Sequence, residues 1–174
     1  MGRGCTALLH CTLRVLERPM REQWMREAIA LSLANVGTGQ GGPFAALLVR
    51  NGTVIAREVN RVTILNDPTA HAEVLAIRAA CQTLRSFQLT DCELYTTCEP
   101  CPMCLGAIYW ARISRFFYGN TRSDAAAIGF DDSLIYNEIG QLPEKRHIPG
   151  ARLLADEAAV AFAEWARSGS KVPY

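Results

Sequence analysis

The stretch "CELYTTCEPCPMCLGAIYWAR", residues 92–112, contains the features that decide the fold. Its first part, "CELYTT", predicts a β-strand. Pro100 and Pro102 then predict a turn and a helix start, because proline is tolerated in a helix only within the first turn. "MCLGAIYWAR" predicts a helix that continues to about residue 111. A strand that leads directly into a helix indicates an α/β protein.

The same stretch contains Cys98, Cys101 and Cys104, which could form a redox pair or part of a metal site. The two prolines divide them. Cys101 and Cys104 open the predicted helix and are three residues apart, so their thiols lie on one helix face. The N-terminus of a helix also favours thiolate over thiol. Cys98 stays at the strand end. We expect it to be a buried residue near the metal site, and the alternative is that it is a fourth metal ligand.

A second helix, predicted over about residues 70–84 with Thr69 as candidate N-cap, opens with "HAE", residues 71–73. His71, Cys101 and Cys104 are three good zinc ligands. Three protein ligands leave one position for water, as in catalytic zinc sites, and zinc lowers the pKa of such a water to about 7. Glu73 can reach that water without binding the metal and can transfer its protons.

Composition restricts the class of protein. The 174 residues are 49% hydrophobic and suit one domain, which we expect over residues 20–174, after a poorly ordered tail at residues 1–19. The net charge of +1 argues weakly against a protein that binds along a nucleic-acid backbone, where a basic stripe is expected, and leaves room for a local basic patch. The odd count of 7 cysteines, without a secretory signal, predicts a cytoplasmic location rather than a disulfide scaffold. No apolar run reaches the roughly 18 residues of a membrane helix.

The remaining patterns predict a sandwich of helices and a mixed sheet. An apolar stripe from Met20 to about Val36 predicts an amphipathic helix. Strands are predicted at about residues 45–50 and 53–59, joined by the strong hairpin signal Asn-Gly. "RFFYG" predicts another strand, and "RLLADEAAVAFAEWARS" a late strand and a final helix. Helices therefore alternate with strands after the initial hairpin.

Two motifs together match the signature of zinc-dependent nucleobase deaminases, His-x-Glu followed by Pro-Cys-x-x-Cys. Here they are "HAE" at 71–73 and "PCPMC" at 100–104. Four longer segments closely resemble the bacterial guanine deaminases of the cytidine/deoxycytidylate deaminase superfamily: "GGPFAALLV", "NDPTAHAEVLAIR", "LYTTCEPCPMCLGAIYWAR" and "AIGFDDSLIYNEI". The resemblance extends from about Met20 to Tyr174. The "GFDDS" block and the C-terminal tyrosine are the parts most specific to the guanine-directed group.

The resemblance implies a fold and a reaction. The fold would be a three-layer α/β/α sandwich around a five-stranded mixed sheet. The reaction would be the hydrolytic deamination of guanine to xanthine and ammonia. Zinc would be held by His71, Cys101 and Cys104, with Glu73 as the proton shuttle. The group forms homodimers that can exchange their C-terminal segments.

The resemblance also implies substrate contacts, each of which has an alternative from the residues alone. Phe44 would be an aromatic wall against the purine, or simply a core residue of a strand. Asn60 would hydrogen-bond the base, or occupy a turn, and the backbone of Ala72 would face the substrate. Asp132 would read the polar edge of the purine and assist proton transfer, or cap a helix. Tyr174 would close the pocket from a partner subunit, or belong to a disordered tail.

Two stretches depart from the family pattern and leave other functions open. Residues 1–19 have no counterpart, and "YGNTRSDAA" at 118–126 differs near the expected mouth of the pocket. A tRNA adenosine deaminase shares both zinc motifs but would need a basic surface. A deaminase of another nucleobase or nucleoside is a second alternative. A structural zinc module without turnover is the alternative outside the enzymes.

Overall fold

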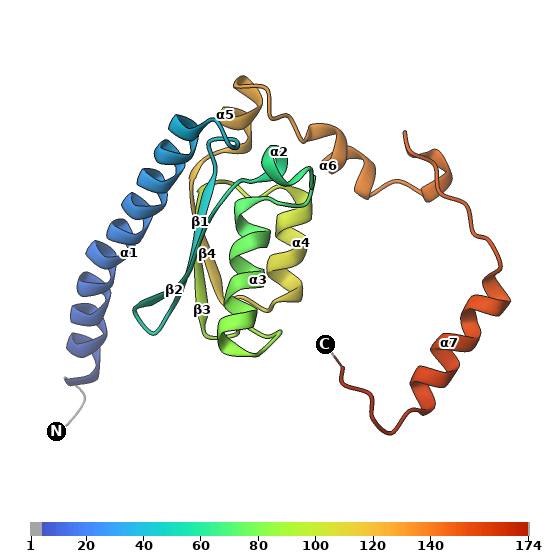
Figure 1. Cartoon of the computed structure of the whole chain (residues 1–174). Coiled ribbons are helices and arrows are strands. Elements are labelled where there is room, and N and C mark those ends of the chain that lie inside the picture. The colour runs from blue at the N-terminus through green and yellow to red at the C-terminus, as the bar shows by residue number, and fades with distance from the viewer. Residues whose placement is uncertain (1–4, 174) are drawn as a thin grey trace. The chain divides into compact units, whose positions relative to one another are not determined.

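The computed structural model describes the backbone of residues 5–173 and the side chains of residues 18–173. The chain, shown in Figure 1, divides into two compact units, Met1–Asp131 and Asp132–Tyr174. The tail of residues 1–19 and the single domain of residues 20–174 stay predictions.

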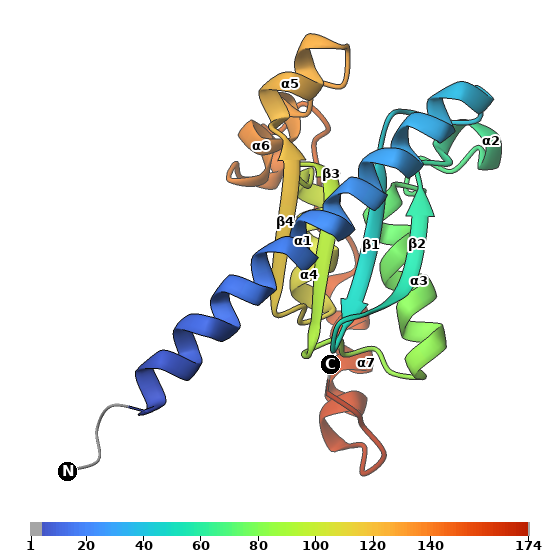
Figure 2. The same ribbon diagram turned by 90° about the vertical axis from the view of Figure 1, so that its left-hand side faces the viewer.

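The first unit contains a mixed four-stranded sheet (Figure 2). Its strands are β1 (Ala45–Arg50), β2 (Thr53–Val59), β3 (Cys92–Cys98) and β4 (Arg115–Asn120), in the order β2-β1-β3-β4. β1 is antiparallel to both neighbours, whereas β3 and β4 are parallel. The predicted mixed sheet and the two hairpin strands are therefore confirmed.

The turn between β1 and β2 explains how this hairpin forms. Asn51 and Gly52 both have positive φ, at 49° and 78°. Positive φ at both central residues is typical of a type I′ turn, whose twist matches that of the flanking strands. Arg50 accordingly pairs with Thr53 directly across the turn.

Helices cover both faces of the sheet, which confirms the three-layer arrangement. Helix α1 (Cys5–Thr38) lies across one face, and α3 (Ala72–Leu84) and α4 (Pro102–Trp110) lie side by side on the other (Figures 1 and 2). The short helices α2 (Val62–Leu65) and α5 (Arg122–Ala127) follow β2 and β4. Helices α3 and α4 both begin at the end of the sheet where β2 and β3 have their carboxyl ends.

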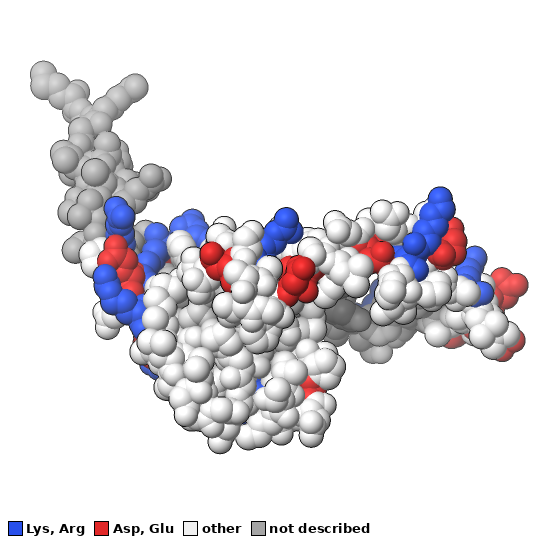
Figure 3. Space-filling model, turned by 90° about the horizontal axis from the view of Figure 1, so that it is seen from above, with Lys and Arg blue, Asp and Glu red and all other residues white. Residues whose placement is uncertain are grey.

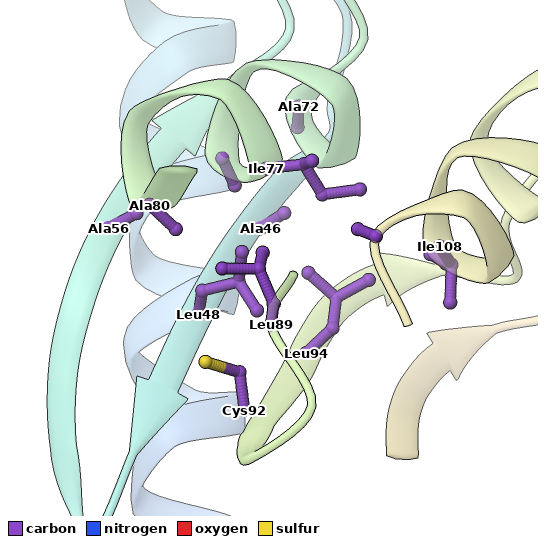
Figure 4. Packing of buried hydrophobic residues seen from close by; sticks show 12 residues of the cluster. Ala46, Leu48, Ala56, Ala72, Ile77, Ala80, Leu89, Cys92, Leu94 and Ile108 are labelled. Atoms are coloured by element: carbon purple, nitrogen blue, oxygen red, sulfur yellow. The ribbon is translucent and has the colours of Figure 1, made fainter. Parts of the chain in front are cut away.

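The core between the sheet and the helices α3 and α4 consists mostly of small and branched apolar residues (Figure 4). Its buried members are Ala46, Leu48, Ala56, Ala72, Ala76, Ile77, Ala80, Leu89, Cys92, Leu94, Ile108 and Ala111. The alanines of α3 allow the helix to approach the sheet closely. Side chains of β3 alternate between the faces, so Cys92 and Leu94 face this core while Tyr95 faces α1.

Helix α1 buries only part of the predicted apolar stripe. Ala28 packs against the sheet together with Trp24 and Met25. Ile29, Leu33 and Val36, which the stripe predicts to be buried, are 43–69% exposed.

Polar residues take the place of those three at the sheet. Ser32 and Asn35 are buried, because their side chains hydrogen-bond the carbonyl groups of the loop that follows α1. The helical spacing of apolar residues on α1 could not predict this, because it is equally compatible with either of two adjacent helix faces packing on the sheet.

The predicted fifth strand does not form within the described residues, where the sheet has four strands. Residues 152–153, which open the stretch that predicts it, are not a strand. Leu154 adopts a left-handed conformation, with φ of 51°, and α7 (Ala155–Arg167) begins directly after it. Only three residues remain between Gly150 and this bend, and no neighbouring strand pairs with them.

The second unit contains α6 (Ser133–Ile139), a 3₁₀ turn at Pro143–Lys145 and α7. None of its described residues is buried within this single chain. Its apolar side chains include Phe162 and Trp165 of α7, which are 82% and 51% exposed. In the part of the chain with assigned structure, no helix has both the length and the apolar character needed to cross a bilayer.

Candidate metal centre and active site

The two predicted motifs lie at the starts of α3 and α4. His71 is the N-cap residue of α3, and Cys101 is the N-cap residue of α4, with Pro102 as its first helical residue. The predicted helix start at Pro102 is therefore confirmed, whereas Thr69 does not cap α3. Thr69 instead donates its N–H and its hydroxyl to Asp67 Oδ1, at 2.8 and 2.7 Å, in the preceding turn.

The three predicted zinc ligands lie together. The Sγ atoms of Cys101 and Cys104 are 3.6 and 3.5 Å from Nδ1 of His71, and the three donor atoms lie within 4.8 Å of one another. A tetrahedral zinc with ordinary bonds to nitrogen and sulfur would hold those atoms about 3.6 Å apart. The donor set and its spacing therefore fit zinc.

Cys98 is not a member of this cluster. It is 5% exposed, and its Sγ lies 3.7 Å from the carbonyl oxygen of Thr121, to which it donates. Its position at the end of β3 agrees with the prediction of a buried neighbour. A closed site with four protein ligands would require Cys98 to turn away from that carbonyl.

A hydrogen bond joins the two ligand thiols. A hydrogen bond from Cys104 and the adjacent His71 lower the pKa of Cys101 to about 4. The same bond and burial raise the pKa of the Cys104 thiol, because a second negative charge beside the first is unfavourable. The hydrogen bond with Cys101 also raises the pKa of His71. The centre thus attracts positive charge, as a zinc site must.

Glu73 lies beside the ligands and is 5% exposed. Its Oε2 accepts from Cys104 Sγ at 3.5 Å, and its Oε1 accepts from the Thr96 hydroxyl at 2.8 Å. Burial raises the pKa of Glu73 above the usual range of a carboxyl. A carboxyl with a raised pKa can both accept and release a proton nearer to neutral pH, which is the property expected of a proton shuttle.

Backbone hydrogen bonds bring the predicted substrate residues to the same end of the sheet. The N–H of Asn60 donates to the carbonyl of Phe44 at 2.9 Å, and the N–H of Arg61 donates to the carbonyl of Ala70 at 3.0 Å. The second bond holds the end of β2 against the residue that precedes His71. Ala72, predicted to face the substrate through its backbone, is the first residue of α3, where an N–H has no partner within its own helix.

The side chain of Asn60 has a fixed orientation. Its Oδ1 accepts from the N–H groups of Gly42 and Val62, both at 3.3 Å. The acceptor of the amide is thereby engaged, so its NH₂ group is the part that can contact a ligand. Asn35 holds the same region from α1, by donating Nδ2 to the carbonyls of Gly42 and Asn60 at 2.9 and 3.1 Å.

Glycine is required where this loop meets Asn60. A Cβ on Gly41 would lie 2.0 Å from the carbonyl oxygen of Asn60, closer than any real contact. The loop can therefore approach the end of β2 only without a side chain at this position.

Phe44 is half-buried and directly precedes β1. Its ring meets that of Phe130 edge-to-face, with centroids 4.9 Å apart and planes at 88°. Phe44 also packs against the main core, so its position is consistent with both the wall and the core interpretation. Phe130, which the sequence patterns do not single out, belongs to the "GFDD" block and is 48% exposed.

Two predicted residues are not placed at this centre. Asp132 begins the second unit, as the N-cap residue of α6. Tyr174 lies outside the described residues. Their roles in substrate binding therefore stay predictions.

Sequence reasoning misses Thr96 and Asn35, although each leaves a signal. Cys92 and Leu94 alternate toward the core, and the next position in this pattern is a polar residue, Thr96. Asn35 likewise stands in line with Ala28 on the sheet-facing side of α1. A buried polar residue on an apolar face needs a hydrogen-bond partner. Thr96 finds it in Glu73, and Asn35 finds it in the carbonyl groups beside Asn60.

Comparison with known proteins agrees with this geometry. The family model described as the cytidine and deoxycytidylate deaminase zinc-binding region matches residues 19–120. This chain therefore belongs to the cytidine and deoxycytidylate deaminase family.

Within the family, the chain is similar to two known proteins and to one solved structure. It is 50% identical to guanine deaminase of Bacillus subtilis, over 88% of this chain and 98% of that relative. The crystal structure of the guanine deaminase from that organism superimposes with a TM-score of 0.85 over the same shares of both chains. A tRNA-specific adenosine deaminase of Agrobacterium fabrum is 53% identical, but only over 44% of this chain and 51% of that relative.

Proposed function

We propose that this chain is a zinc-dependent hydrolase that converts guanine and water to xanthine and ammonia. The observation that carries the proposal is the cluster of His71, Cys101 and Cys104 with the buried carboxyl of Glu73 against it. The likeness to the Bacillus subtilis guanine deaminase, which covers almost the whole of that protein, supports guanine as the substrate.

The residues of the centre divide the chemistry among them. When bound, zinc supplies the activation of water at neutral pH. His71, Cys101 and Cys104 would hold the metal. Glu73 would pass one proton of the attacking water to the purine ring nitrogen and the second proton to the amine, which leaves as ammonia, while the oxygen stays on the ring carbon as the new carbonyl of xanthine. Burial of Glu73 keeps bulk water from competing for these protons.

Substrate recognition would use the residues around the mouth of the site. Asn60 presents its NH₂ group as a donor, so it suits an acceptor on the base. Phe44, steadied by Phe130, offers the face of a ring to the purine. Asp132 would bind the donor groups at the polar edge of guanine and assist proton transfer. A buried polar site discriminates well, because a wrong base leaves its donors and acceptors unpaired.

The distribution of charge favours a small molecule over a nucleic acid. On the described surface visible in Figure 3, basic and acidic side chains are interspersed and much of the area belongs to neither kind. A protein that follows a phosphate backbone would instead concentrate its Lys and Arg residues in a stripe. A cytoplasmic location would keep the described cysteines, which are all free thiols, reduced.

The active form would be a homodimer that exchanges its C-terminal segments. Within one chain, α7 buries none of its residues, although it carries Val160, Phe162 and Trp165. Apolar side chains of this size on a short helix are normally covered by a neighbour. In this arrangement, Tyr174 closes the pocket of the partner subunit.

A substrate panel tests the proposed function. Ammonia release is measured with the zinc-loaded protein on guanine, guanosine, adenine, cytosine and a tRNA anticodon stem-loop. We expect turnover of guanine, with xanthine as the second product. Turnover of the stem-loop alone, with strong salt dependence of binding, would replace the proposal by tRNA adenosine deamination. Inertness toward every substrate despite bound zinc would favour a structural zinc module.

A further inference from the structure

The hydroxyl of Thr96 donates a hydrogen bond to the carboxyl of Glu73. It lies 2.8 Å from Glu73 Oε1, and both residues are buried, at 0% and 5% exposure. A bond of 2.8 Å between a hydroxyl and a carboxylate has ordinary, favourable length. The second carboxylate oxygen, Oε2, faces the cluster of metal-ligating residues and lies 3.5 Å from Cys104 Sγ.

The sheet explains why this contact is rigid. β3 is an interior strand, paired with β1 through Ala46 and with β4 through Tyr118 at the position of Thr96. β-branched residues have few side-chain rotamers, so the strand holds the hydroxyl of Thr96 in a nearly fixed direction. Glu73, in the first turn of α3, has a longer, unbranched side chain with more rotatable bonds. The fixed hydroxyl therefore restricts the conformations that this side chain can adopt.

Alternation along β3 restricts this role to one position. Thr96 shares the face of Cys92 and Leu94, under α3, whereas Tyr95 faces α1. The neighbouring Thr97 uses its hydroxyl to accept from the N–H of Ala45, at 3.0 Å. Although two threonines are adjacent, only Thr96 reaches Glu73.

From this geometry we propose that Thr96 is a positioning residue for the reaction. Its hydroxyl binds Oε1 of Glu73, and this contact keeps Oε2 directed toward the metal centre. Thr96 is not one of the three metal ligands, and its hydroxyl is hydrogen-bonded to Glu73. The inference rests on the proposed function only in taking Glu73 as the proton-transfer group. It adds an orienting partner that the zinc motifs do not contain.

Two substitutions separate this role from simple packing. Thr96→Val keeps the shape of the side chain and removes the hydroxyl, whereas Thr96→Ser keeps the hydroxyl and removes a methyl group. We expect Thr96→Val to lower kcat about 10- to 100-fold, the range typical of partners that orient groups at a metal site. KM should change less than threefold, and Thr96→Ser should restore most of kcat.

Tyr95→Phe is the matched control. It removes a hydroxyl that donates to a carboxylate, Glu93 Oε2, at 2.7 Å, from the adjacent residue of the same strand but on the opposite face. Because Tyr95 is remote from the centre's face of the sheet, kcat should stay within about twofold of the wild type. Equal thermal unfolding of Thr96→Val and Tyr95→Phe would exclude a general loss of stability as the cause.

Two readouts do not depend on turnover. Zinc content should remain equal in the wild type, Thr96→Val and Thr96→Ser, because Thr96 does not hold the metal. Crystal structures should show Glu73 displaced in Thr96→Val and unchanged in Thr96→Ser. An unchanged Glu73 in Thr96→Val, or a kcat no lower than that of Tyr95→Phe, would overturn the inference.

The failure of this inference and that of the proposed function can be told apart. If guanine is inert while another base in the panel is deaminated, the proposed substrate fails, and the same comparison of variants is made with the active base. If guanine is turned over and Thr96→Val retains full kcat, only the positioning role fails. A Thr96→Val protein with normal kcat and a raised KM would assign Thr96 to substrate binding instead, and would also reject the inference.

Discussion

At the scale of single residues, Glu73 separates an enzyme from a structural metal protein. Its carboxyl is within 3.5 Å of a ligand thiol, yet it is not needed to complete the His-Cys-Cys cluster. Zinc bound by three protein groups keeps a position for a reactant, whereas a structural zinc is usually enclosed by four. The carboxyl therefore has a chemical role available that a purely structural site would not require.

The variant Glu73→Gln tests that role. We expect zinc to remain at about one ion per chain and kcat to fall by about 10² to 10⁴, the usual contribution of general acid–base catalysis. Glutamine keeps the shape and can still accept from Thr96, so folding should be preserved. Metal analysis and steady-state ammonia release measure the two effects. Loss of the metal together with the activity would show instead that Glu73 supports zinc binding.

Cys98 provides the corresponding test of ligand number. Its Sγ donates to the carbonyl of Thr121, outside the cluster of donor atoms. We expect Cys98→Ser to retain zinc and most of its activity, whereas the matched variant Cys101→Ser loses the metal. Zinc content after dialysis measures both. Loss of zinc from Cys98→Ser would contradict a centre with three protein ligands.

At the scale of elements, the turn before α3 fixes the approach of the chain to His71. Asp67 accepts two hydrogen bonds from Thr69, which lower the pKa of the Asp67 carboxyl, with a smaller contribution from Arg78. The N–H of Ala70 also donates to the carbonyl of Asp67, at 3.0 Å. The ionised form of this side chain is therefore part of the turn.

The variant Asp67→Asn should reveal this through pH. Because folding lowers the pKa of Asp67, its charge stabilises the native state above the unfolded pKa of about 4. That contribution is lost as the pH falls through the lower, folded value. The difference in free energy of unfolding between wild type and variant should be constant from about pH 5 to 7 and shrink below about pH 3. Urea unfolding over this range measures it, and a difference undiminished at about pH 2 would refute it.

Elements defined by local signals are the ones that the sequence predicts correctly. The strands around Asn51-Gly52 and the start of α4 at Pro102 depend on backbone preferences that each residue carries with it. The exposed side of α1 is different: Leu33 is apolar and still 69% exposed. Which stripe faces the sheet is decided by packing against strands distant in sequence, and by the carbonyl groups that Asn35 must reach.

The same reasoning explains what could be predicted of the site. Metal ligands follow from residue chemistry and spacing, so His71, Cys101 and Cys104 are recognisable from the sequence alone. The partner of Glu73 is not, because Thr96 meets it only after α3 has docked over β3. The fifth strand fails for a related reason: the strand propensity of residues 152–153 has an effect only if they pair with an edge of the sheet, and they pair with neither edge strand, β2 or β4.

At the scale of the whole molecule, the residues proposed for catalysis and substrate binding are distributed over the two units. The described zinc ligands and Glu73 belong to Met1–Asp131, whereas Asp132 begins the other unit. If C-terminal segments are exchanged in a dimer, one complete site needs residues from two chains.

Mixing two inactive variants tests this division. Glu73→Gln retains Tyr174 but lacks the proton shuttle, and a variant without Tyr174 has the converse defect. In a mixed dimer, the subunit with intact Glu73 receives Tyr174 from its partner. We expect activity to appear when the two proteins are unfolded and refolded together, approaching about a quarter of the wild-type value, since about half of the dimers are mixed and each has one complete site. No recovery despite mixed dimers would contradict exchange.

The positions of the ligands have a consequence for how the molecule persists when it is not turning over. His71 and Cys101 are thirty residues apart and begin the two helices that lie side by side over the sheet. A metal between them is a reversible cross-link that closes the intervening chain, and such a closure reduces the conformational freedom of the unfolded state. The ion that activates water would thus also link α3 to α4. Scarcity of zinc would therefore shorten the lifetime of the folded protein as well as abolish its activity.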